Sequence, residues 1–139
     1  MSATNYLEDA LLKHIFEGAA FTQPTEIWVG LSTADPGEDG TALDEPVGNG
    51  YLRVRPTDAT GRWTIAEASD VTTAENKGDI VFPEASGAWG TLAYACIFDN
   101  GTDGQDGTLL MSFELDTPRV IGNGDALKIA AGDLVITLD

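Results

Sequence analysis

The spacing of apolar residues changes once along the chain, and this change limits the folds that the chain can adopt. Residues 5–17 carry apolar side chains at helical spacing, whereas short alternating or apolar runs separated by Gly, Pro, Asp and Asn follow Phe21. Spacing of i, i+4 gives a helix one apolar face, and alternation gives a half-buried strand. Several short strands with turn signals between them are typical of β-sandwiches and barrels. We therefore predict a mainly β fold, an antiparallel and jelly-roll-like β-sandwich, with one N-terminal α-helix.

The helix is predicted over residues 5–17. Thr4 or Asn5 is suited to cap its first turn, and Asn5 followed by Glu8 approximates a capping box. Gly18 is suited to end the helix as a left-handed cap. The apolar face of the helix consists of Leu7, Leu11, Leu12, Ile15 and Phe16. In an assembly of several copies, we expect these five side chains to serve both the core and the contacts between copies.

Eight strands are predicted from the runs that follow the helix. They cover residues 26–32, 51–55, 62–67, 79–82, 91–98, 108–115, 124–129 and 132–138. The mostly apolar run 91–98 is the best candidate for a central strand, with 108–115 as its hairpin partner. The turn at 130–132 predicts that the last two strands form a second hairpin. In the run 51–55, strict alternation predicts that Leu52 and Val54 face inward and that Tyr51, Arg53 and Arg55 face outward.

Length and charge limit the classes of protein to consider. The 139 residues suit one domain spanning 1–139, and no linker divides them. With 7 Lys and Arg against 23 Asp and Glu, the net charge is −16. This charge argues against nucleic acid and against anionic membrane surfaces, because both attract basic proteins. It also opposes close association of copies, so any assembly must pair or screen its acids.

No residue pattern predicts an enzyme or a cofactor site. The single His14 has no partner nucleophile in a recognisable motif, and the single Cys96 alternates within an apolar strand as a small buried hydrophobe does. Asp99, Asp103 and Asp106 lie in one loop with the oxygen-rich character that Ca²⁺ prefers. The alternative is a plain hairpin loop, because Asp and Gly are favoured turn residues.

Two further groups of residues are candidates for contacts. Arg53 and Arg55 are predicted to share one strand face, and they suit contact with an acidic neighbouring copy. The alternative is pairing with acids of the same chain. Trp28 and Trp63 lie in strand patterns and are interpreted as core, whereas Trp89 lies in a predicted turn and is a candidate for stacking on a glycan.

Five segments carry a resemblance to a known group of proteins. They are residues 4–12, 28–36, 82–90, 97–99 and 131–138, which together sample nearly the whole chain. In amino-acid sequence, these segments resemble small tailed-bacteriophage virion proteins that are commonly labelled phage tail fibre proteins. The resemblance includes no catalytic signature, so it transfers no functional residues.

The resemblance implies a small, non-enzymatic virion structural protein that is made in the cytoplasm of a host bacterium. The chain lacks shaft repeats, heptads and glycine-periodic stretches, so a compact module on the capsid surface or on the tail fits it as well as a fibre does. The expected partners are other copies of the chain, most simply in a trimer, and other phage virion proteins. The alternative function is a receptor- or carbohydrate-binding β-sandwich module of a phage tail.

Overall fold

The structure, a computed structural model, describes residues 2–102 and 107–138. One helix, α1 (Asn5–Glu17), is followed by most of the strands. The strands are β1 (Ser2–Ala3), β2 (Trp28–Ser32), β3 (Trp63–Ala68), β4 (Val71–Asn76), β5 (Ile80–Val81), β6 (Gly90–Phe98), β7 (Leu109–Ile121), β8 (Lys128–Ile129) and β9 (Val135–Leu138). The prediction of a mainly β chain with one N-terminal helix is confirmed.

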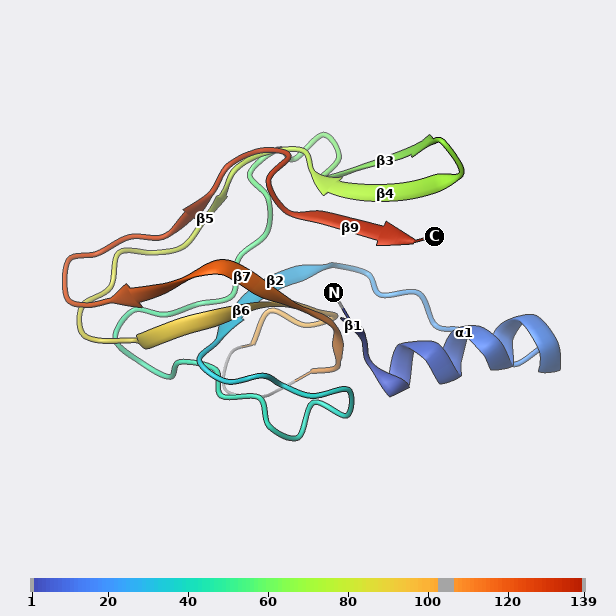
Figure 1. The fold of residues 1–139 in the computed structure, drawn as a ribbon, viewed down its shortest axis with the longest axis horizontal. Coiled ribbons are helices and arrows are strands. Elements are labelled where there is room, and N and C mark those ends of the chain that lie inside the picture. The colour runs from blue at the N-terminus through green and yellow to red at the C-terminus, as the bar shows by residue number, and fades with distance from the viewer. Residues whose placement is uncertain (1, 103–106, 139) are drawn as a thin grey trace.

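The strands form antiparallel sheets in two layers (Figure 1). The four-stranded sheet has the order β1-β7-β6-β2, and the three-stranded sheet β3-β4-β9 lies over it. A short pair, β5-β8, extends the upper layer. The main core lies between the layers, where apolar side chains of β2, β6 and β7 meet side chains of the connecting segments, as a β-sandwich requires.

The hairpin of β6 and β7 is the centre of the larger sheet, as predicted. β7 is longer than expected, because it continues beyond residue 115 to Ile121. The ladder register shifts between Leu92 and Tyr94, whose partners are Arg119 and Glu114. Pro118 lies within this irregular stretch, where its missing N–H removes no regular ladder bond.

The pairing of the later strands differs from the prediction in two respects. The last two strands do not pair with each other, because β8 pairs with β5 and β9 pairs with β4. In addition, β4 was not predicted, although it forms a hairpin with β3. The turn of this hairpin is Ser69-Asp70, and both residues have positive φ, at 54° and 65°. Two consecutive positive φ values fit the tight turn that suits hairpins, but Ser-Asp is not one of its usual sequences.

The bounds of α1 agree with the prediction, and Gly18 ends the helix in the left-handed conformation with φ 66°. The expected capping box is wrong. Thr4 is the N-cap residue, but its side chain makes no cap hydrogen bond. Instead, its Oγ1 donates to the carbonyl oxygens of Leu109 and Leu110, at 2.8 and 3.1 Å. Thr4 therefore fastens the start of α1 to β7.

Candidate functional site

A polar cluster lies in the interior near β2. The Arg53 guanidinium donates from Nε to Glu45 Oε1 at 2.8 Å and from Nη2 to Glu45 Oε2 at 2.7 Å. Its Nη1 donates to the Asn100 carbonyl oxygen at 2.9 Å. Both charged side chains are fully buried, and the guanidinium lies 3.5 Å from the centroid of the Phe98 ring. A bidentate pair with this geometry satisfies charges that would otherwise be costly to bury.

Tyr51 connects this pair to the sheet. Its hydroxyl donates to Glu45 Oε1 at 2.8 Å and accepts from the Leu31 N–H at 2.8 Å. Burial and the adjacent Glu45 carboxylate raise the pKa of Tyr51 well above its ordinary value. Gly30 makes room for the cluster, since a Cβ there would lie 2.8 Å from both Glu45 Oε1 and the Phe98 ring. The cluster is closed and internally paired, so it stabilises the fold rather than presenting a reactive group.

The cluster corrects the predicted orientation of the run 51–55. This segment is not a strand, and only Val54 forms an isolated bridge, with Val29. Tyr51 and Arg53 are each 2% exposed and Leu52 is 54% exposed, so the predicted orientation is wrong for these three residues. The reason is the buried Glu45 carboxylate, which requires a cation and a hydroxyl donor beside it. Val54 packs against the core as predicted, and Arg55 is partly exposed.

The arginines pair within the chain, which was the alternative interpretation. Arg55 forms an ion pair with Glu26, and its guanidinium lies 4.7 Å from the centroid of the Trp28 ring. The buried Arg53 cannot face a neighbouring copy, so the expectation that both arginines line an outward contact face is wrong. A role of Arg55 in a contact is not tested by its pairing.

The remaining predicted residues divide between the core and the loops. Trp89 is 5% exposed, its Nε1 donates to the Asn49 carbonyl oxygen at 2.9 Å, and its ring meets Tyr51 edge to face. The expectation of a surface tryptophan for glycans is therefore wrong, because Trp89 packs into the core. Cys96 is buried as expected, and burial raises the pKa of its thiol to about 12.

The loop proposed for Ca²⁺ is only partly described. Asp103 and Asp106 lie outside the described residues. The Asp99 carboxylate accepts a hydrogen bond from the Thr108 N–H at 2.7 Å, as in a plain hairpin loop. Within residues 2–102 and 107–138, no group of three or more His, Cys, Asp or Glu side chains is arranged to hold a metal ion. The calcium hypothesis therefore remains an untested prediction.

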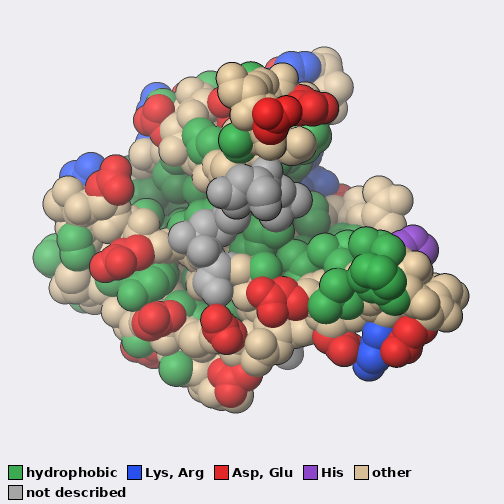
Figure 2. Space-filling model, turned by 45° about the vertical axis from the view of Figure 1, so that its right-hand side comes forward, with side chains coloured by type: hydrophobic (Ala, Val, Ile, Leu, Met, Phe, Trp, Pro, Cys, Tyr) green, Lys and Arg blue, Asp and Glu red, His purple; other side chains and the backbone are tan. Residues whose placement is uncertain are grey.

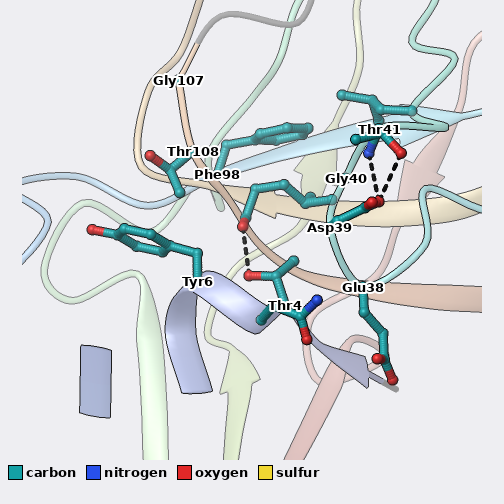
Figure 3. Close-up of a pocket in the computed structure, with 12 residues that line it drawn as sticks. Thr4, Tyr6, Glu38, Asp39, Gly40, Thr41, Phe98, Gly107 and Thr108 are labelled. Atoms are coloured by element: carbon teal, nitrogen blue, oxygen red, sulfur yellow. Dashed lines mark hydrogen bonds between the residues drawn. The ribbon is translucent and has the colours of Figure 1, made fainter. Parts of the chain in front are cut away.

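One hollow of about 470 Å³ lies beside the start of α1 (Figure 3). Its walls mix backbone with the side chains of Thr4, Tyr6 and Phe98, and Asp39 lies at its rim. The Asp39 carboxylate accepts hydrogen bonds from the N–H and the hydroxyl of Thr41, at 3.0 and 2.8 Å. These bonds hold the pKa of Asp39 below its ordinary value. The carboxylate is thus kept ionised and is poorly suited to act as a general acid.

The most unusual surface lies on α1. Leu7 is buried, but the helix extends past the edge of the larger sheet (Figure 1). Four later apolar side chains of the helix are exposed, and we call them the helix ridge: Leu11 at 40%, Leu12 at 57%, Ile15 at 67% and Phe16 at 80%. Of the five predicted helix residues, Leu7 alone belongs to the core, and the other four are available for contact.

A second apolar surface lies next to the ridge. It is a groove of about 370 Å³ between α1, the end of the larger sheet and the β3–β4 arm. Every side chain that lines it is apolar or aromatic, including Phe21, Ile27, Trp63, Ile65, Met111 and Ile136. In Figure 2, hydrophobic side chains form a broad area that runs from the helix toward the hollow below the upper layer. Contiguous exposed apolar surface of this kind marks an interaction site.

The exposed apolar surfaces favour contact with other proteins. Among the described residues, no helix is long and apolar enough to cross a membrane. The fold and the exposed surfaces define a small mainly β protein whose clearest candidate site is an apolar interaction surface.

The family is shown by comparison with known proteins. The family model described as Podophage GP4 fiber I protein gp80 matches residues 2–137, so the chain belongs to this family of phage fibre proteins. It is a structural component of a phage virion, assembled in the host, as the resemblance implied. No curated protein matches the chain.

Proposed function

We propose that the chain is a non-enzymatic, multi-copy component of the surface of a phage particle that stabilises the assembly through contacts between proteins. Its copies associate with one another, most simply as trimers, and pack on neighbouring virion proteins of a fibre or of the capsid. The helix ridge is the surface that makes these contacts.

The observation that carries the proposal is the exposure of the ridge. Leu12, Ile15 and Phe16 are more than half exposed on one short helix, although the chain has enough other residues to cover a core. Leaving large apolar side chains in water gives up about 1.5–3 kcal/mol for each one that a partner would bury. A neighbouring protein in the virion would recover this free energy.

Association of the purified chain tests the proposal. Sedimentation velocity over a range of concentrations is expected to show oligomers, and Phe16→Glu is expected to weaken association more than tenfold, because it would bury an unpaired charge. Val120→Glu is the matched control, since Val120 is similarly exposed and lies toward the far end of β7. Equal loss of association in both variants would point to added charge alone and would contradict a role of the ridge.

Two further measurements separate this proposal from the rival function. Electron microscopy of particles labelled with an antibody to the chain is expected to show many copies at regular positions. A glycan array is expected to remain blank. A specific glycan signal from a chain that stays monomeric would favour the receptor-binding function instead.

A further inference from the structure

The helix ridge and the apolar groove lie side by side on one chain, and within residues 2–102 and 107–138 no other segment covers either of them. The ridge cannot enter its own groove, because Thr4 and Leu7 hold the start of α1 against β7 and the core. The ridge belongs to the last two turns of the helix, which point past the sheets (Figure 1). Among the described residues, none is placed to fill the groove, which leaves room there for another molecule.

From this arrangement we infer that the occupant of the groove is the helix ridge of a second copy of the chain. The inference rests on the proposed self-association and names the two surfaces that meet. The groove would take the ridge of one neighbour while the ridge of the same chain enters the next groove. A head-to-tail contact of this kind closes into a ring when the rotation between copies allows it.

Charge favours this occupant. Each copy carries a net charge of −16, so contact through surfaces without acids avoids a repulsion that other surfaces would have to pair or screen. None of the described residues that line the groove is charged. On the last two turns of α1, helical geometry places the ridge on one half of the helix and Lys13, His14 and Glu17 on the other. The ridge therefore presents four exposed apolar side chains on one continuous face of α1.

The size of the contact sets its expected strength. Covering the exposed parts of the ridge removes on the order of 400 Å² of apolar surface from water, and an equal area of groove doubles this figure. Stable specific interfaces bury roughly 1,200 Å² or more. We therefore expect a weak contact in dilute solution, which becomes populated when many copies are held close together on a particle.

Cysteine cross-linking is suited to a weak contact of this kind. One preparation carries Phe16→Cys on the ridge, and a second, distinguishable by mass, carries Ile65→Cys in the groove. The native Cys96 is buried and does not compete for a cross-linker in the folded chain. After mixing and treatment with a short bismaleimide, the heterodimer of Phe16→Cys with Ile65→Cys is expected to be the main product. Adding Leu12→Glu to the ridge chain should lower its yield about tenfold or more.

The control pair is Phe16→Cys with Val120→Cys, since Val120 is exposed and does not line the groove. Cross-links in the control pair as abundant as in the ridge–groove pair would overturn the inference. Homodimers of Phe16→Cys without the heterodimer would show that ridges meet each other, which overturns the groove assignment but leaves the proposed self-association intact. Absence of every cross-link from a chain that sediments as a monomer at high concentration would overturn both.

Discussion

The interior beside β2 and the outer end of α1 reverse the usual distribution of polar and apolar groups. Glu45 and Arg53 are fully buried, whereas Phe16 is 80% exposed. In the cluster beside β2, the Glu45 carboxylate accepts hydrogen bonds from Arg53 and Tyr51. On the last two turns of the helix, four large apolar side chains are exposed. The buried charges are thus paired within one chain, whereas the exposed apolar end of the helix is the surface that we propose an assembly covers. Substitutions in the two regions should therefore affect different measurements.

The largest effect is expected at Arg53. Arg53→Ala leaves the Glu45 carboxylate buried and uncompensated, which should lower the free energy of unfolding by about 3–5 kcal/mol. Arg55→Ala is the matched control, because its pair with Glu26 is partly exposed and such pairs contribute about 0–1 kcal/mol. Urea unfolding followed by tryptophan fluorescence measures both. Equal losses in the two variants would show that the buried pair is not special.

Two positions on α1 provide a direct contrast within one element. Leu7→Ala removes a buried side chain and should cost about 2–3 kcal/mol. Phe16→Ala removes a larger but exposed side chain and should change the stability of the single chain by no more than about 0.5 kcal/mol. Thermal unfolding at low concentration measures stability, and sedimentation measures association. Substantial destabilisation of the monomer by Phe16→Ala would mean that the ridge packs on its own chain.

A smaller effect is expected at Gly30, which makes room for the interior cluster. A Cβ at this position would lie 2.8 Å from Glu45 Oε1 and 3.0 Å from the Tyr51 hydroxyl. Gly30→Ala should therefore cost about 1–3 kcal/mol through displacement of packed groups. Gly18→Ala is an informative control, because Gly18 has open space around it and only its positive φ disfavours a side chain. Urea unfolding of Gly30→Ala with an unchanged midpoint would indicate that the cluster is loosely packed.

Elements of the fold that depend on local signals could be predicted from the sequence. The helix was predicted with its observed bounds, because spacing and a C-cap glycine are local signals. The central hairpin was predicted from two long apolar runs. The hairpin of β3 and β4 was missed because Ser69-Asp70 is not a usual turn sequence. Local signals were therefore sufficient only where the usual residues occupied the usual positions.

Prediction of the candidate site was limited by long-range contacts. Alternation placed Arg53 on the surface, because nothing local shows that Glu45 is buried beside it. Trp89 lies in a turn-like sequence, yet its ring reaches the core against Tyr51. Conversely, the apolar face of α1 was recognised, but periodicity cannot show that the sheet ends before the last two turns of the helix.

The exposed ion pairs are a third region to compare with the buried cluster and the helix end. The smallest expected effect on stability is at Asp79. Its carboxylate accepts hydrogen bonds from Lys128 Nζ and from the Ala131 N–H, each at 3.1 Å. The bond from Lys128, followed by the one from Ala131, holds the pKa of Asp79 below its ordinary value of 3.8. A depressed pKa in the folded state means that the unfolded chain binds the proton more readily. The stabilisation is therefore present above the unfolded value and is lost as the pH falls through the folded value.

Melting temperatures measured from neutral pH down to about pH 2 test this expectation. Asp79→Asn should remove a small part of the acid-induced loss of stability, since the amide has no proton to gain. Lys128→Met should have a partial effect, because it removes the larger of the two causes and leaves the Ala131 bond in place. If neither variant changes how steeply the melting temperature falls with decreasing pH, Asp79 contributes nothing to the acid sensitivity of the fold. The loss of stability on substitution of Asp79 should also be far smaller than the loss on substitution of Arg53. Water screens the exposed pair of Asp79 and Lys128, whereas the pair of Arg53 and Glu45 is buried.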